Sequence, residues 1–415
     1  MTKADVTIPT ARPSRSAKLP GLLLKSERIR QNKGQKEVCH GICVPSYLSK
    51  IEHGSVCPDR KILSELFGRL GICYEEDAAK LSCCQKLIEN YFYRLQYELD
   101  TKTVYGELKA EDEKLRCSEY AVDWLLVRAF EQEDVISFLE ELEGHMEPKQ
   151  HAYYQLLRSL SVEDVAEKVL LCKEACDVLH HSYAMNFLCD AYLLAGNYSA
   201  IHAMEQRIVA AAVGEGNTFQ LADFFFLNGS AYACLNMEEM MMLYYERGIK
   251  LLQNTGWQNR LAMLYYNIGA TYISLKKYDL ALQYLKMAED HGEASFDILQ
   301  KKAIVLIRMG RKEEAAEFLE KLRETLFNRK EAESPSVDML KYEEAVMECE
   351  DGFLENPEYL ELLEKLIRAI RKERHFGHLY FYRDVIMEAC KRQRKYKKAL
   401  EFQNEISGNV IKNSF

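Results

Sequence analysis

The chain has 415 residues, which is enough for two or three domains at the usual ~100–200 residues each. It holds only 8 Pro and 20 Gly, and no apolar run approaches the ~18 residues that a membrane span requires, so we expect a helical protein without a membrane segment. The net charge is −9, yet residues 1–61 hold 12 Lys or Arg against 5 Asp or Glu. A basic head on an acidic body favours duplex binding by the head alone.

The N-terminal residues 1–19 are basic and contain proline, but they lack the continuous apolar core of a secretion signal, so we expect a disordered arm. The 13 cysteines are scattered and odd in number, which favours reduced thiols in the cytoplasm over disulfides. The Cys and His residues around position 40 include no Cys-x-x-Cys pair. We therefore expect no metal and no other cofactor.

Two short helices joined by a turn are predicted early in the chain. In the first, over 35–42, Val38 lies on the apolar face. Pro45 fits the first position of the second helix, where its missing N–H is harmless, and Leu48 and Ile51 then point inward. The opposite face of this second helix carries side chains that can bond to phosphates or base edges, and we expect it to face solvent.

This stretch resembles the phage-repressor-like (XRE-type) helix-turn-helix family over about residues 20–75, through Gln35 and the run Ser-Lys-Ile-Glu-His-Gly at 49–54. The resemblance implies that the second helix reads bases in the major groove and that the start of the first touches the DNA backbone. It leaves open whether Arg28 or Arg30 braces Glu52. The predicted DNA-binding residues are Gln35, Lys36, Pro45, Ser46, Tyr47, Ser49 and Lys50.

Behind this head the sequence repeats itself. Ala281 and Ala315 stand at corresponding places of two successive units, and their separation equals the ~34-residue period of tetratricopeptide (TPR) repeats. Gly269 is the small residue that would let the first helix of one unit pack closely on the second. Weaker and less regular copies precede these units, and another includes Tyr396. We expect stacked helical hairpins that form a right-handed solenoid with a concave inner surface.

The first helix of each repeat should line that concavity. A column of amides there can pair with the main chain of a peptide whatever its side chains. Each of these residues could equally be an ordinary helix-packing or solvent-facing residue. The predicted peptide-binding residues are Asn186, Asp190, Asp223, Asn228, Tyr266, Asn267 and Ser274.

The order of parts resembles the peptide-responsive regulators of Gram-positive bacteria, the RRNPP group that includes the Rgg, PlcR and PrgX families. The resemblance implies a cytoplasmic homodimer that binds a double-stranded DNA operator and senses a short signalling peptide, as in quorum sensing. Dimerisation would use C-terminal hairpins, with the aromatic run 375–382 as a candidate unless it is buried in the repeat core. A TPR scaffold for another protein with a DNA-binding head, or a phage lysis–lysogeny peptide sensor, remains open.

No catalytic motif is present, so we do not expect an enzyme. The predicted fold is all-α, with a helix-turn-helix domain followed by a TPR-like α-solenoid. The predicted domains are a disordered arm over 1–19, the helix-turn-helix domain over 20–75, linker helices over 76–117 and the repeat domain over 118–415.

Overall fold

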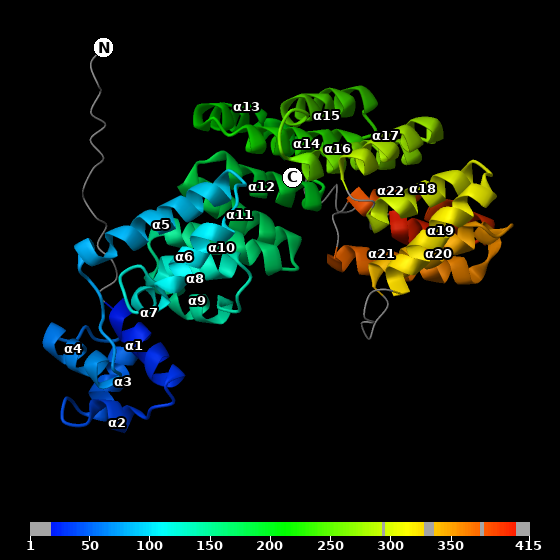
Figure 1. Cartoon of the computed structure of the whole chain (residues 1–415). Helices are drawn as coiled ribbons and strands as arrows, with labels where there is room; N and C mark the ends of the chain where they lie inside the picture. The colour runs from blue at the N-terminus through cyan, green and yellow to red at the C-terminus, as the bar shows by residue number, and fades with distance from the viewer. Residues whose placement is uncertain (1–17, 293–294, 328–335, 374–376, 404–415) are drawn as a thin grey trace, which may run out of the picture. The chain divides into compact units, whose positions relative to one another are not determined.

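The computed structural model describes residues 18–292, 295–327, 336–373 and 377–403. Within these ranges the chain consists of α-helices and short 3-10 turns (Figure 1), and the only β-type feature is an isolated bridge between Glu75 and Ser118. The all-α prediction is therefore confirmed. In the described part of the chain, no helix is both long and apolar enough to cross a membrane. Residues 1–17, which make up most of the predicted arm, lie outside the described ranges.

Contacts group the chain into two compact units, Met1–Ser161 with Glu174–Leu179 and Val162–Lys173 with His180–Phe415. Helix α11 (Val165–Leu179) is divided between them. The helices of the first unit are α1 (Leu19–Arg30), α2 (Gln35–Cys39), α3 (Pro45–Glu52), α4 (Arg60–Arg69), α5 (Ala78–Gln96), α6 (Lys102–Ala110), α7 (Asp112–Leu115), α8 (Ala121–Phe130), α9 (Ile136–Leu142), η1 (Glu143–His145) and α10 (Pro148–Ser161).

Helices α1 to α4 share one small apolar core. Val38 of α2 and Leu48 and Ile51 of α3 are fully buried in it, as the helical spacing predicts, together with Phe67 of α4. Proline begins α3, and Gly54 ends it with a φ of +62°, a conformation that glycine adopts at little cost. Helix α2 ends at Cys39, earlier than the predicted limit at residue 42, because the chain turns through Gly41 with a φ of +76°.

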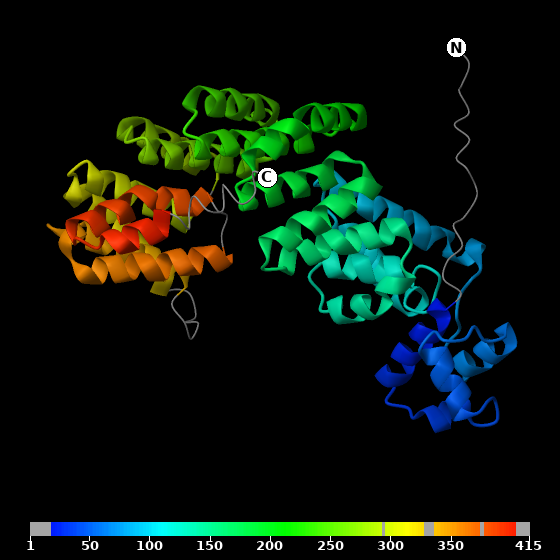
Figure 2. The same ribbon diagram turned by 180° about the vertical axis from the view of Figure 1, so that it is seen from behind.

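The second unit consists of successive antiparallel helix pairs (Figure 2). After the last labelled helix, residues 396–403 are also helical. The labelled elements are α12 (Ser182–Ala195), α13 (Tyr198–Glu215), α14 (Thr218–Cys234), α15 (Glu238–Leu252), α16 (Gln258–Ser274), α17 (Tyr278–His291), α18 (Phe296–Arg308), α19 (Lys312–Phe327), α20 (Val337–Glu348), η2 (Phe353–Glu355), α21 (Pro357–Glu373) and α22 (Gly377–Arg392).

Small residues let the helices of a pair approach closely. A Cβ atom on Gly269 of α16 would lie 2.9 Å from Leu285 Cγ of α17, and one on Gly229 of α14 would lie 2.6 Å from the Tyr245 ring of α15. Ala281 of α17 is fully buried at the same kind of contact. The TPR-like hairpins that the sequence predicts over α16–α17 and α18–α19 are thus present, and α12–α13 and α14–α15 form the pairs before them.

Candidate functional site

The head presents the start of α3 to solvent. Pro45, Ser46 and Lys50 are exposed, and so is Lys36 on the first turn of α2. Their exposure follows from the helical period, because Leu48 and Ile51 fill the core on the other side of α3. These four predicted DNA-binding residues therefore lie on an accessible surface that carries two lysines.

The other three predicted DNA-binding residues are more enclosed. Tyr47 is half-buried and packs against the core of the head, so the expectation that its side chain faces solvent is wrong. The reason is its position directly before the inward Leu48, at the edge of the apolar face. Ser49 is half-buried with its hydroxyl 3.5 Å from His53 Nδ1, and the Gln35 amide donates to Glu52 Oε2 at 2.7 Å.

A buried carboxylate holds three helices of the head together. Glu52, at the end of α3, accepts from Arg28 Nε of α1 at 2.6 Å and from Arg28 Nη2 at 2.9 Å. Arg30 instead pairs with Glu27 on its own helix. The question left open by the sequence is therefore answered in favour of Arg28, and the position of α3 is fixed from two sides.

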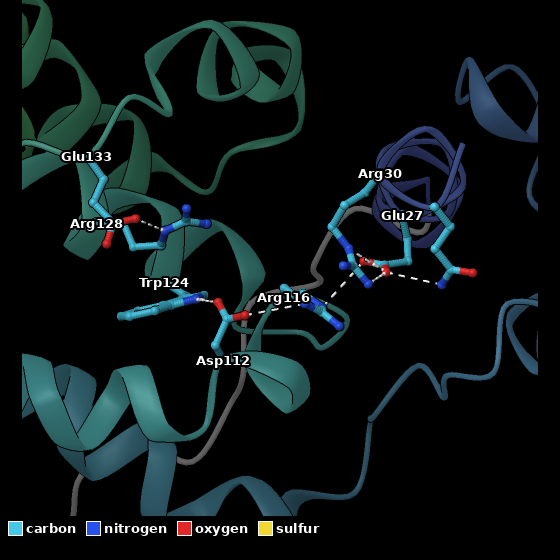
Figure 3. A network of polar contacts seen from close by, with 8 residues as sticks. Glu27, Arg30, Asp112, Arg116, Trp124, Arg128 and Glu133 are labelled. Atoms are coloured by element: carbon cyan, nitrogen blue, oxygen red, sulfur yellow. Dashed lines mark hydrogen bonds and ion pairs between the residues drawn. The ribbon is translucent and has the colours of Figure 1, made fainter. Parts of the chain in front are cut away.

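A second polar network joins the head to the helices that follow it (Figure 3). Arg116 lies between Glu27 of α1, with Nε 3.4 Å from Glu27 Oε2, and Asp112 of α7, with Nη1 3.4 Å from Asp112 Oδ2. The Trp124 indole of α8 donates to Asp112 Oδ1 at 2.8 Å. Cys117, at the end of the predicted linker segment, is buried in the core of the head.

Sequence reasoning did not find this network. The one residue that could have indicated it is Glu27, an acid on the inward face of α1. Its side chain is only 4% exposed in the structure. Burial alone would raise the pKa of Glu27. Hydrogen bonds from Arg30 and Gln31 and the charge of Arg116 outweigh burial, so the pKa lies below its usual value. The carboxylate is therefore kept charged at the contact between α1 and the residue before Cys117.

The second unit contains a cavity of about 1020 Å³. Its wall combines apolar and aromatic side chains with amides, hydroxyls and charged groups, which is the composition of sites that bind small organic ligands or peptides. Most lining residues come from the first members of successive hairpins, α12, α14, α16 and α18, and from α22, and a few come from α15, α17, α20 and η2. This agrees with the expectation that the first helix of each repeat lines the inner surface.

Four of the predicted peptide-binding residues meet at this cavity. Asp190 of α12 and Tyr266, Asn267 and Ser274 of α16 all line it. Asp190 and Ser274 are exposed to the cavity space or solvent. The Asn267 amide nitrogen donates to the Met263 carbonyl of its own helix at 3.0 Å, and this hydrogen bond fixes the orientation of the Asn267 side chain.

The other three predicted residues do not line the cavity. Asn186 is buried and donates to the Gln220 carbonyl and side-chain oxygens at 2.8 and 2.7 Å. Asn228 is fully buried, with its Oδ1 2.6 Å from His202 Nδ1, and Asp223 forms an ion pair with Arg260. Placing these three on the inner surface was wrong, because they join neighbouring helices.

A cluster of buried and half-buried charges also borders the cavity. Asp297, Lys301 and Arg308 of α18 and Glu348 of α20 line it. Arg308 Nη2 lies 3.2 Å from Glu348 Oε1, and although burial opposes the charge, Glu348 raises the pKa of Arg308. Sequence reasoning missed this cluster, since these residues occupy positions of a repeat helix that normally hold packing side chains.

The sequence predicted that the aromatic run 375–382 is either a dimer contact or part of the repeat core. The structure describes the side chains of its last two residues, Phe381 and Tyr382. Tyr382 is buried and its hydroxyl donates to Glu344 Oε2 at 3.0 Å, while Phe381 is half-buried beside the cavity. The side chains of 375–380 lie outside the described residues. In the described part of the chain, no three His, Cys, Asp or Glu side chains gather as a metal site, and all 13 cysteines are free thiols.

The fold and the cavity define a class: tandem TPR-like hairpins around a ligand-sized cavity. The chain has the fold of Rap protein, whose crystal structure is of its complex with competence and sporulation factor, with a TM-score of 0.59 and 12% identity over 81% of this chain and 98% of that one. It is likewise similar to the apo form of the quorum sensor NprR from B. thuringiensis, with a TM-score of 0.55 and 16% identity over 80% and 99% of the two chains.

The apo form of RapI gives a TM-score of 0.50 and 13% identity over 79% of this chain and 96% of that chain. No protein-family model matches the chain, and no curated protein matches it in sequence. At these identities the likenesses show the fold. The helical-repeat fold expected from the resemblance to peptide-responsive regulators is therefore confirmed.

Proposed function

We propose that this protein is a transcriptional regulator that binds operator DNA through its head and senses a short signalling peptide in its repeat unit. The observation that carries the proposal is the presence, in one chain, of an accessible surface on α2 and α3 with two lysines and of a 1020 Å³ cavity lined mainly by the first helices of TPR-like hairpins. The likeness in fold to a Rap protein complexed with competence and sporulation factor and to the quorum sensor NprR supports the proposal that the repeat unit senses a peptide.

The head would bind duplex DNA by placing α3 in the major groove. Lys36 at the start of α2 suits a phosphate contact, while Ser46 and Lys50 on the exposed side of α3 suit contacts to base edges. The buried Glu52 brace would hold α3 at a fixed angle to α2, which base reading requires. Gln35, whose amide nitrogen donates to Glu52, would contact a phosphate through its backbone N–H or its second amide N–H.

The cavity would bind the peptide in an extended form. Asn267, Asp190 and Ser274 offer donors and acceptors for its main chain, and Tyr266 offers a flat apolar surface with a hydroxyl. Peptide binding would favour one arrangement of the repeat hairpins, and that arrangement would favour or disfavour the head geometry that matches the operator. We propose that the protein acts in the cytoplasm as a homodimer whose two heads occupy two half-sites. No catalytic step belongs to this proposal.

The experiment that tests the proposal starts from the full-length protein and a pool of random duplexes. Duplexes retained through repeated selection are then used in fluorescence anisotropy titrations with Lys50→Ala and with Lys86→Ala, which removes the same charge from an exposed position of α5 outside the head. We expect Lys50→Ala to weaken binding by about tenfold and Lys86→Ala to leave it unchanged. Equal binding by the two variants would overturn the assignment of the DNA surface.

The peptide arm uses a pooled library of short random-sequence peptides and measures the affinity for the selected duplex with and without it. A change in duplex affinity supports a peptide-responsive regulator. If the head binds DNA but the library neither binds nor changes that affinity, the repeat unit is a scaffold for another protein, and the sensing half of the proposal is wrong.

A further inference from the structure

Lys301 is a buried lysine that, among the described residues, has no acid in direct contact with its ammonium group. Its side chain is 2% exposed and borders the cavity. Among the described residues, no hydrogen bond or ion pair reaches its ammonium group, which lies 3.5 Å from the ring centroid of Phe381 and 5.5 Å from that of Tyr382. The three neighbouring cations are all paired: Lys302 with Glu289, Lys341 with Asp297 and Arg308 with Glu348.

Holding this ammonium in place is costly to the fold. Burial, together with the charges of Lys341 and Arg308, lowers the pKa of Lys301, while Glu344 and Asp297 oppose that shift. The aromatic faces of Phe381 and Tyr382 compensate only part of the lost hydration, because a cation–π contact is weaker than a full ion pair. A well-packed apolar side chain at this position would stabilise the free protein more.

The charges around Lys301 balance when every group is ionised, so an additional negative charge requires one of the acids to take up a proton. Three cations, Lys301, Lys341 and Arg308, face three acids on α18 and α20. The acid left over from the two neighbouring ion pairs is Glu344, which accepts from Gln300 Nε2 at 3.2 Å and from the Tyr382 hydroxyl at 3.0 Å. Burial and the nearby Glu348 raise the pKa of Glu344, so of the three acids it is the one that can take up the proton.

A monoanion that enters the cavity can thus pair with Lys301 while Glu344 becomes neutral, and the cluster stays balanced. A dianion such as phosphate would leave an unbalanced buried charge. Besides charged side chains, the cavity wall near Lys301 includes the apolar Ile298 and the aromatic Phe381, so the anion should be attached to an apolar or peptide-like group. These two properties together describe a carboxylate of a peptide.

We propose that Lys301 is the anchor for a single carboxylate of the bound peptide, either its C-terminus or an Asp or Glu side chain. This inference rests on the proposed function, in which the cavity binds a peptide. Lys301 would then be the residue that gives the cavity its preference for acidic ligands, while the amides and hydroxyls of α16 bind the main chain.

The test uses three pooled libraries of short random-sequence peptides with the full-length protein. The first has free C-termini but no Asp or Glu, the second has amidated C-termini with Asp and Glu allowed, and the third is amidated and lacks both acids. Retained peptides are quantified by affinity-selection mass spectrometry. We expect the first or the second library to be enriched about tenfold or more over the third, and which of the two is enriched identifies the source of the carboxylate.

The matched variants are Lys301→Met and Lys302→Met, because Lys302 is the adjacent buried lysine, already paired with Glu289 and not part of the cavity wall. Lys301→Met should abolish the preference for carboxylates and keep or raise the unfolding temperature, whereas Lys302→Met should keep the preference. Equal retention of all three libraries by the unmutated protein would overturn the carboxylate anchor and leave peptide sensing intact. Retention of none would overturn both.

Discussion

Arg28 and Glu52 form a two-point ion pair between α1 and α3, with Nε to Oε1 at 2.6 Å and Nη2 to Oε2 at 2.9 Å. The Glu52 side chain is 1% exposed, and Gln35 of α2 donates to the same carboxylate. One buried acid therefore sets the relative position of the three helices that would present the DNA-binding surface.

Removing one partner of this pair should loosen α3. In Arg28→Met the Glu52 carboxylate stays buried without its main partner, which typically costs about 3–5 kcal/mol. We expect faster hydrogen exchange of the backbone amides over 45–52, measured by mass spectrometry. The double variant Arg28→Met with Glu52→Met should recover most of the protection, and equal exchange in the single and double variants would contradict this account.

Alanine at two glycines of the head should change its stability in opposite directions, because one glycine lies at the close crossing of α1 and α3 and the other lies in open space. A Cβ atom on Gly21 of α1 would overlap the Ile51 carbonyl oxygen and lie 3.0 Å from Ile51 Cγ2, whereas nothing lies within 4 Å of a Cβ on Gly68 of α4. Gly21→Ala should therefore destabilise the head by about 1–3 kcal/mol. Gly68→Ala should stabilise it by about 0.5–1 kcal/mol, because alanine favours the helix.

Hydrogen exchange of the amides over 45–52 can check both glycine variants in the full-length protein. Slower exchange in Gly68→Ala and faster exchange in Gly21→Ala is the expected pair of results. Slower exchange in both variants would show that the crossing at Gly21 is wider than the structure has it, and faster exchange in both would contradict the open position of Gly68.

Tyr47 combines a packing role with a proposed DNA contact, and two substitutions separate them. Its ring packs against the core of the head, so Tyr47→Ala should cost about 1–3 kcal/mol of stability as well as DNA affinity. Tyr47→Phe keeps the ring and should leave the thermal unfolding of the head unchanged while weakening binding to the selected duplex by about 1 kcal/mol. Unchanged duplex affinity in Tyr47→Phe would remove the hydroxyl from the DNA interface.

The sequence predicted those features that depend on local periodicity. The inward positions of Val38, Leu48 and Ile51 follow from one helical face, and the close approach at Gly269 follows from the repeat spacing. It could not tell that Asn186 would be covered by Gln220, because in stacked hairpins each helix meets neighbours on several sides. For such helices the polar or apolar character of a position does not reveal which neighbour covers it.

The same limit explains why the buried charges were missed. Lys301 reads as a solvent-facing lysine within a repeat helix, and only the return of α22 in space places Phe381 over its ammonium. The role of Arg116 likewise depends on a contact between distant parts of the chain, because Arg116 pairs with Glu27 only in the folded protein. Contacts between residues far apart in the sequence carry no periodic signal.

Glu133 gives a prediction for pH. Hydrogen bonds from Tyr105, from Lys109 at 2.9 Å and from Arg128 at 2.7 Å lower its pKa from 4.5 to about 2. A lowered pKa means that the carboxylate stabilises the fold above the unfolded value of 4.5 and that this contribution is lost as the pH falls towards 2. The side chain is 26% exposed, so we expect a contribution of roughly 1–2 kcal/mol.

The measurement is urea unfolding followed by the fluorescence of Trp124, which lies in the same unit, in a Trp257→Phe background. Glu133→Gln should be less stable than its parent at about pH 6, and the difference should shrink at about pH 3. Glu113→Gln, at an exposed position of α7, serves as the control. A difference that does not change with pH would mean that the hydrogen bonds of Glu133 do not depend on its charge.

A variant at Arg116 can separate the binding of peptide and of DNA from the effect that peptide binding has on DNA affinity. Its ion pairs with Glu27 and Asp112 join the head to α7, and Trp124 of α8 holds Asp112 from the other side (Figure 3). If peptide binding alters DNA affinity through the helices behind the head, this link is one of the contacts that must carry the change. Arg116→Met keeps an unbranched apolar stem and removes both ion pairs.

On the proposed function, Arg116→Met should bind the peptide library and the selected duplex separately about as well as the unmutated protein. The change in duplex affinity caused by the peptides should shrink by about fivefold, which corresponds to the ~1 kcal/mol of a partly exposed ion pair. Arg94→Met is the control, since Arg94 of α5 donates to the Asp100 carbonyl and does not contact the head. An unchanged peptide response in Arg116→Met, with the response of Arg94→Met also unchanged, would show that the signal reaches the head by another route.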